Sequence, residues 1–158
     1  MKIVLKDADF SQSGIPTPHE VVLNGSVLVN PFTGAFTSNS NVSRGADESN
    51  IPYTNKKIIN NANSSALLFI LYYASDNTYL GCASYNGTDS YVPIEANGGN
   101  VRIDQCDHYM KPVDATHLTE MTTQEVSNLK ANTSYWRLAV QSGSGNIADA
   151  SISLEIVE

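Results

Sequence analysis

The longest apolar run in the chain, Ala66 to Ala74 ("ALLFILYYA"), limits the elements that this sequence can form. It is less than half the roughly 20 residues that a helix needs to cross a bilayer, so we expect no membrane insertion. The run is apolar on both alternating faces, which is typical of a central strand covered on each side; a short buried helix is the alternative. We favour the strand because "SDN" follows it as a hairpin turn would, and "TYLGCASY" then resumes an alternating pattern.

Further strand-length pieces follow at close turn spacing. In "VVLNGSVLVN" the pair Asn24-Gly25 lies between two apolar runs, which predicts a hairpin with a type I′ turn. Asn100 to Tyr109 also has the length of a strand. Phe32 to Asn55, by contrast, is rich in Gly, Ser and Asn with only small apolar islands, and it predicts a long loop that is functional or wraps the core.

The C-terminal part contains the one predicted helix and two clean alternating strands. Thr122 and Glu125 have the spacing of a capping box, and the predicted helix spans Thr122 to Lys130. In "SYWRLAVQ", Trp136 shares a face with Leu138 and is expected in the core. Two further residues are expected on the opposite face of that strand, Tyr135 and Arg137.

These patterns predict a fold class. Roughly eight to ten short strands, almost no helix and an abundance of Asn, Ser and Thr indicate an all-β protein. We predict an antiparallel β-sandwich of jelly-roll type with one short helix. Because 158 residues suit one compact domain and no linker divides them, residues 1–158 are expected to form a single domain.

Charge and the first residues exclude several classes of partner. The net charge of -7 and the isoelectric point near 4.8, with no basic cluster beyond Lys56-Lys57, argue against nucleic acid as a partner and against binding to an anionic membrane. The opening "MKIVLKDADF" has too short an apolar stretch for a signal peptide, so we expect either that the protein is not exported by that route or that these residues are part of a longer chain.

We expect no enzyme, cofactor or metal site from the motifs. Every second residue of one predicted strand could share a face, and these residues are Arg102, Asp104, Cys106 and His108. Asp, Cys and His can bind a metal ion, but neighbours in a row on one strand do not converge on an ion as a metal site requires. A glycosidase pair could be drawn from Glu95, Asp104 and Glu120, yet sequence does not show the separation of about 5 to 10 Å that such a pair needs. The two cysteines, Cys82 and Cys106, are predicted to be free thiols.

Tyrosine is the most suggestive residue type, because it supplies eight of the aromatic side chains. Exposed tyrosine rings beside Asn, Asp and Arg are suited to stack on a sugar and to bond its hydroxyls, whereas half-buried structural tyrosine is the alternative for any single ring. The candidate ligand-binding residues, expected to meet at one rim of the predicted strands, are Tyr85, Tyr91, Arg102, Asp107 and Tyr109.

Four segments, taken in order, resemble β-sandwich modules of bacteriophage tail-fibre and receptor-binding proteins and of surface or secreted proteins of gut bacteria. They are "IVLKDADFSQSGI", "IPYTNKKII", "LFILYYASDNTYLG" and "SYWRLAV". In such modules a Tyr-Asp turn followed by a "Y-(L/I)-(S/G)" strand precedes a late "Y-x-R-(L/I/F)" strand. The matching stretches here are Tyr73 to Gly81 and Tyr135 to Leu138. The chain departs from the pattern at Tyr73-Ala74-Ser75-Asp76 and at Ser127 to Thr133, where the usual proline-containing run is replaced.

The resemblance implies a non-catalytic module. We expect it to recognise carbohydrate or another receptor at a cell surface, and to be virion-associated, extracellular or on a cell surface. The alternative is a purely structural domain of virion or surface assembly, without glycan binding, whose tyrosines are all packed. A homo-oligomer is compatible with either role.

Overall fold

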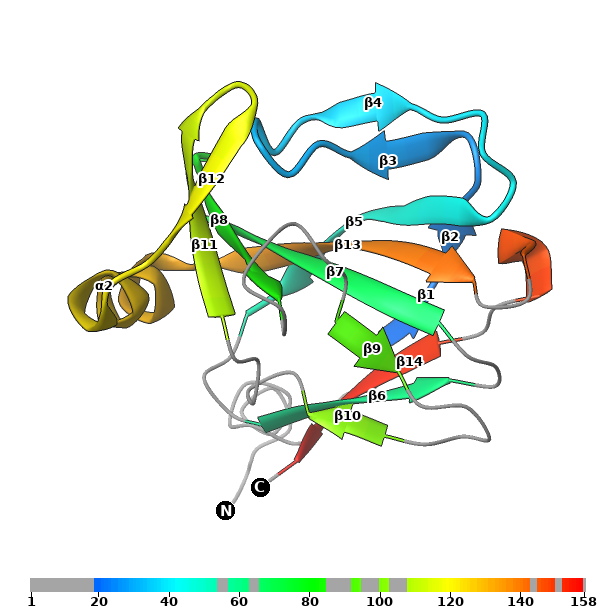
Figure 1. Ribbon diagram of the computed structural model, residues 1–158. Helices are drawn as coiled ribbons and strands as arrows, with labels where there is room; N and C mark the ends of the chain where they lie inside the picture. The colour runs from blue at the N-terminus through cyan, green and yellow to red at the C-terminus, as the bar shows by residue number, and fades with distance from the viewer. Residues whose placement is uncertain are drawn as a thin grey trace, which may run out of the picture.

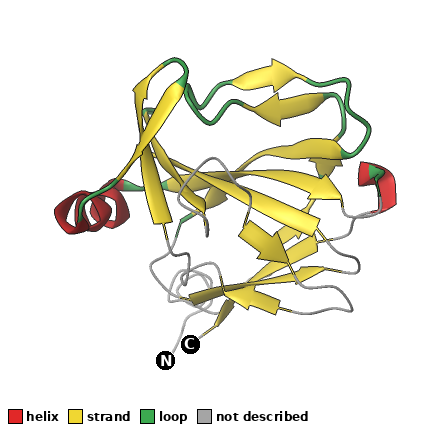
Figure 2. Ribbon diagram, viewed as in Figure 1, coloured by secondary structure: helices red, strands yellow, loops and turns green. Residues whose placement is uncertain are grey.

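The fold was examined in a computed structural model that describes residues 19–53, 57–62, 66–84, 92–94, 100–102, 108–142, 145–149 and 152–157. The protein is all-β, with antiparallel strand pairs and, within these residues, one α-helix (Figures 1 and 2). The predicted fold class is confirmed, and the jelly-roll topology stays a prediction. An eight-stranded sheet lies between a four-stranded sheet and a two-stranded hairpin.

The eight-stranded sheet forms the middle layer. Its strands in spatial order are β12 (His117–Glu120), β11 (His108–Asp114), β8 (Tyr79–Ser84), β7 (Ala66–Tyr73), β13 (Tyr135–Ser142), β5 (Arg44–Pro52) and β2 (Leu23–Asn24), with β9 (Val92–Ile94) also paired to β7. The four-stranded sheet has the order β1 (His19–Val21), β14 (Ile152–Val157), β6 (Lys57–Ala62) and β10 (Asn100–Arg102). The outer hairpin is β3 (Val27–Val29) with β4 (Phe36–Ser38). Helix α2 (Thr123–Asn132) and the short 3₁₀ helix η2 (Ile147–Asp149) complete the described elements.

The longest ladder joins β7 to β13 at the centre of the molecule. It runs without a break from Tyr73 opposite Tyr135 to Ala66 opposite Ser142. The apolar run is therefore a strand with neighbours on both sides, as predicted, and the buried-helix alternative is excluded. Its side chains from Phe69 to Tyr73 are all buried, which requires a covering layer on each face of the sheet.

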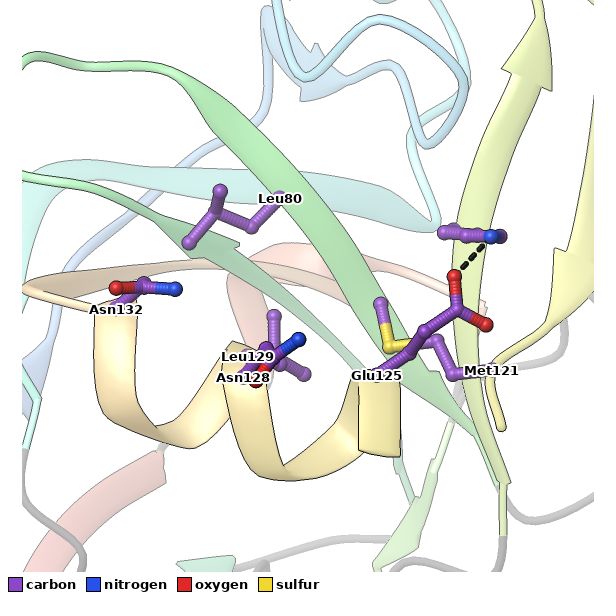
Figure 3. Close-up of a pocket in the computed structure, with 7 residues that line it drawn as sticks. Leu80, Met121, Glu125, Asn128, Leu129 and Asn132 are labelled. Carbon is purple, nitrogen blue, oxygen red and sulfur yellow. Dashed lines mark hydrogen bonds and ion pairs between the residues drawn. The ribbon is translucent and has the colours of Figure 1, made fainter. Parts of the chain in front are cut away.

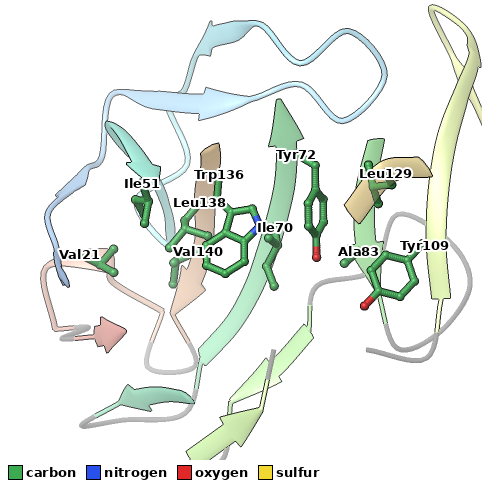
Figure 4. Packing of buried hydrophobic residues seen from close by; sticks show 10 residues of the cluster. All are labelled: Val21, Ile51, Ile70, Tyr72, Ala83, Tyr109, Leu129, Trp136, Leu138 and Val140. Atoms are coloured by element: carbon green, nitrogen blue, oxygen red, sulfur yellow. The ribbon is translucent and has the colours of Figure 1, made fainter. Parts of the chain in front are cut away.

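One face of this sheet carries a core built around Trp136. The predicted grouping of Trp136 with Leu138 is confirmed, and both pack with Ile70 and Tyr72 (Figure 4). The indole meets the ring of Tyr72 edge to face, with ring centres 6.2 Å apart. Aromatic pairs prefer this arrangement, which adds to the free energy of burial.

The opposite face carries a tyrosine cluster beneath the β3–β4 hairpin. Tyr73 and Tyr135 stack with ring centres 5.1 Å apart and planes 3° from parallel. The Tyr73 hydroxyl donates a hydrogen bond to the Gly34 carbonyl (2.5 Å), and the Tyr79 hydroxyl donates one to the Pro31 carbonyl (2.6 Å). The tyrosine hydroxyls thus hold the loop between β3 and β4 against the sheet.

Alkaline pH is expected to destabilise this fold. Burial raises the pKa of Tyr73 to about 12, and burial also raises the pKa of Tyr79. Tyrosine in an unfolded chain ionises near pH 10, so between about pH 10 and 12 the native state keeps a proton that the unfolded state has lost. The free energy of unfolding should therefore fall over this window, by roughly 3 kcal/mol from Tyr73 alone at 1.4 kcal/mol per pKa unit.

Denaturant unfolding at a series of pH values measures this loss. The Tyr73→Phe variant should be less stable at neutral pH, because it lacks the bond to Gly34, but its stability should depend less on alkaline pH. An equally steep dependence in the variant would assign the alkaline loss to other groups.

The hairpin predicted at Asn24-Gly25 is wrong. The chain does turn there, but β2 pairs with β5 while β3 pairs with β4, and Gly25 does not have the positive φ of a type I′ turn. The two apolar runs belong to different layers, because the turn carries the chain from the middle sheet to the hairpin that covers it.

The long loop predicted for Phe32 to Asn55 is also wrong, because this segment contains β4 and the nine-residue strand β5. The ladder between β5 and β13 shifts register between Trp136 and Leu138, opposite Ile51 and Asp47. The residues in the shift form a β-bulge, and their side chains are exposed.

Two other predictions concern β10, β11 and the thiols. Asn100 to Tyr109 is not one strand, because β10 and β11 belong to different sheets.

Cys82 is a buried free thiol, as predicted, and Cys106 lies outside the described residues. Among the helices of the described part, none is long and apolar enough to cross a membrane.

Candidate ligand-binding groove

Helix α2 begins with the predicted capping box. The Thr122 hydroxyl accepts a hydrogen bond from the Glu125 N–H (3.2 Å), and the Glu125 carboxylate accepts one from the Thr122 N–H (3.0 Å). The helix ends at Thr133, whose N–H and hydroxyl both donate to the Leu129 carbonyl. The predicted helix is confirmed and extends to Asn132.

The helix docks on the sheet through a narrow apolar stripe. Leu129 is buried in the core that contains Trp136, and Val126 and Met121 are partly buried against it. The Met121 N–H donates to the Tyr109 carbonyl (2.8 Å), which ties the segment before α2 to β11. Apart from Leu129, Val126 and the half-buried Glu125, the residues of the helix are exposed.

An ion pair joins the first turn of α2 to β11. The Lys111 ammonium donates to the Glu125 carboxylate, whose other oxygen accepts the capping bond from Thr122. The bond from Lys111, and then the one from the Thr122 backbone, lowers the pKa of Glu125. The carboxylate therefore stays ionised at neutral pH.

A groove of about 230 Å³ runs between α2 and the strands β8 and β11 (Figure 3). Its floor is apolar and comes from Leu80, Met121 and Leu129. Its polar groups lie along one side of the helix and at one end; they are Lys111, Glu125, Asn128 and Asn132. A small set of polar groups around an apolar floor is the general composition of small-ligand sites.

Two amides give the groove its hydrogen-bonding capacity. The Asn128 side-chain oxygen accepts a bond from Gln124 (3.0 Å), which orients the amide. Within the described residues, neither the Asn128 side-chain nitrogen nor the Asn132 amide has a hydrogen-bond partner. An amide nitrogen offers two donors and an amide oxygen two acceptor sites, so these residues can bind several hydroxyls.

The predicted site residues lie elsewhere or outside the described part. Tyr85, Tyr91 and Asp107 are outside it. Tyr109 is only 9% exposed and packs against Tyr72 with ring centres 6.1 Å apart, so its ring lies in the core. Arg102 ends β10 in the four-stranded sheet, whereas Tyr109 is on β11 in the other.

The sequence reasoning missed the two groove amides, although a signal was present. Glu125 and Asn128 lie three positions apart in the predicted helix, on one face with Leu129, and Asn132 continues that face four positions later, beyond the predicted helix end at Lys130. The helix was predicted from its cap and apolar residues, and its polar face was not considered as a site.

A serine, a histidine and an aspartate also meet at the β5 bulge. The buried Asp47 carboxylate accepts bonds from His19 (3.0 Å), from the Val22 N–H, and from both the N–H and hydroxyl (2.5 Å) of Ser49. In a catalytic triad the two ring nitrogens of histidine separate the acid from the serine. Here His19 Nε2 faces both groups and the serine bonds the carboxylate directly, so the arrangement holds the bulge in place instead of activating a nucleophile.

No group of three or more possible metal-ligating side chains occurs within the described ranges. Comparisons with known proteins find no matching family model, no similar curated protein and no similar solved structure.

Proposed function

We propose that this protein is a non-catalytic binding module that recognises carbohydrate at a cell surface through the groove beside α2. The observation that supports the proposal is the pair of amides, Asn128 and Asn132, whose side-chain nitrogens have no hydrogen-bond partner among the described residues and lie above the apolar floor. A sugar ring presents hydroxyls around its edge and C–H groups on its faces. The amides suit the hydroxyls, and Leu80 and Met121 suit the C–H surface.

The charge of the groove favours a neutral or weakly polar ligand. Lys111 and Glu125 neutralise each other, and Glu125 is already engaged by the helix cap. A ligand that competes for either charge would break an existing bond, whereas a ligand that bonds the amides breaks none. The proposed carbohydrate-binding role also keeps four ligand-binding residues that were predicted from the sequence: Tyr85, Tyr91, Arg102 and Asp107.

A glycan array tests the proposal with wild-type protein and the double variant Asn128→Ala/Asn132→Ala. Wild type is expected to bind a restricted set of glycans at tens of micromolar protein. The double variant should bind the same glycans at least tenfold more weakly, since each lost hydrogen bond is worth about 1 kcal/mol. Alanine is a better helix former than asparagine, so the variant should keep its fold.

The matched control is Ser127→Ala, which changes an exposed residue on the same helix outside the groove. It should bind as wild type does. Wild-type protein that binds no glycan above background would contradict the proposed function, and equal binding by the double variant would move the site away from α2.

The second candidate is a structural domain of virion or surface assembly. The observation that favours it is the packing of the described tyrosines: Tyr72, Tyr73, Tyr109 and Tyr135 are buried, and the other two, Tyr53 and Tyr79, are partly buried. Light scattering of the purified protein tests this role. A trimer or higher oligomer without glycan binding would favour assembly, whereas a monomer that binds glycans would favour recognition.

A further inference from the structure

Arg137 projects from β13 on the face opposite Trp136, as its position in the sequence predicts. The guanidinium carbon lies 4.5 Å from the ring centre of Phe36 and 4.5 Å from that of Tyr73. The Tyr135 ring centre is 5.6 Å away. The flat cation is thus held among aromatic rings, a favourable setting for arginine that also fixes its orientation.

The hydrogen-bonding capacity of Arg137 is largely unused. A guanidinium has five N–H donors. Within the described residues it makes two long bonds, from Nε to the Asn50 side-chain oxygen (3.4 Å) and from Nη1 to the Gly34 carbonyl (3.4 Å). It also interacts with the Tyr73 hydroxyl, where its charge and hydrogen bonding oppose the rise in pKa that burial causes. No carboxylate of the described part forms an ion pair with it.

The surroundings of this cation are rigid. The Gly34 carbonyl also accepts the short bond from Tyr73, and Gly34 has a φ of +72° that an L-residue rarely adopts. On the other side, Asn50 belongs to the β5 bulge that Asp47 holds through Ser49. Gly34 and Asn50, which accept hydrogen bonds from the guanidinium, are therefore held in position before a ligand binds. This lowers the entropy cost of binding a ligand there.

We propose that Arg137 is the anchor of a second ligand site, which takes a carboxylate group, with the exposed Asn50 amide as an additional donor. Guanidinium and carboxylate match in a planar, two-bond geometry, and the half-buried Arg137 keeps N–H donors that its bonds to Asn50 and Gly34 do not use. The site does not depend on the groove beside α2. The net negative charge of the chain opposes an anion only weakly, because physiological salt screens charges beyond about 8 Å.

The test is a nuclear magnetic resonance titration that follows the side-chain Nε–H signal of Arg137 and the backbone signals of β13. The probes are glucuronate, acetate and glucose. Saturable shifts with roughly millimolar affinity are expected for glucuronate and acetate, and none for glucose at this site. Tighter binding of glucuronate than of acetate would identify an acidic sugar as the ligand, and equal binding would identify the carboxylate alone.

Three variants complete the test. Arg137→Lys keeps the charge but not the fork, and it should bind acetate at least tenfold more weakly. Asn50→Ala should weaken binding severalfold, because it removes the additional donor and the bond that Arg137 Nε makes to the Asn50 side-chain oxygen. Arg44→Lys, an arginine on β5 away from these contacts, should bind as wild type does. Absence of a saturable shift in the wild-type Arg137 signal would overturn the proposal, whether or not Arg137→Lys folds, and so would unchanged binding by a folded Arg137→Lys.

Discussion

The Gly81→Ala variant is expected to lose about 3 kcal/mol of unfolding free energy or more. Gly81 has a φ of +148°, which strains any residue with a side chain, and a β-carbon there would overlap the carbonyl oxygen of Met110 on β11. Relief requires β8 and β11 to separate where Cys82 faces Met110. Because small domains are stable by only about 5 to 15 kcal/mol, the loss is large.

Gly145 provides the matched control. It also has a positive φ, +89°, but apart from its own and its neighbours' atoms no atom of the described residues lies within 4 Å of where a β-carbon would be. The Gly145→Ala variant should therefore show the backbone strain alone, about 1 kcal/mol. Chemical denaturation of both variants separates strain from overlap, and similar losses in the two would show that the Met110 carbonyl is not the obstacle.

Truncation of Trp136 to alanine is expected to cost about 4 kcal/mol. The indole is 3% exposed, and its removal leaves a cavity between the rings of Tyr53 and Tyr72, which it meets edge to face. The midpoint of thermal or denaturant unfolding measures the loss. A loss below about 1 kcal/mol would mean that the core collapses into the space.

The Trp136→Phe variant should be much milder than Trp136→Ala. The indole nitrogen is buried and has no hydrogen-bond partner in the described part of the chain, so tryptophan carries a cost at this position that phenylalanine does not. Phenylalanine keeps an aromatic ring beside Tyr72 and removes the unpaired donor. We expect it to cost about 1 kcal/mol, from lost volume alone. A loss as large as that of the alanine variant would show that the indole nitrogen stabilises the core.

Local sequence patterns correctly predicted the elements that are determined by residues only a few positions apart. The capping box of α2 depends on Thr122 and Glu125, three positions apart, and it forms as predicted. The two faces of β13 follow from alternation alone, so Trp136 and Arg137 lie on the expected sides. The fold class follows from many such short strands.

Elements that depend on distant partners were missed. Strand β5 contains Gly45, Asp47 and Ser49, residues with little preference for strands, and it forms because β13 and β2 supply its hydrogen bonds. Its bulge exists because Asp47 finds donors on His19 and Val22, more than twenty residues away. The environment of Arg137 could not be predicted for the same reason: it depends on contacts between distant strands, because Phe36, Asn50 and Tyr73 come from three other strands.

The position of β14 has a consequence for how the chain acquires its structure. This strand lies between β1 and β6, and it pairs His19 with Leu154 and Lys57 with Val157. Until residues 152–157 have left the ribosome, β1 and β6 have no strand between them, so the four-stranded sheet is completed only after more than ninety residues have followed β6. Contacts over such long sequence separations make folding slow, on the order of milliseconds to seconds. The nascent chain therefore exposes two unpaired strand edges, and its yield should depend on protection from aggregation during translation.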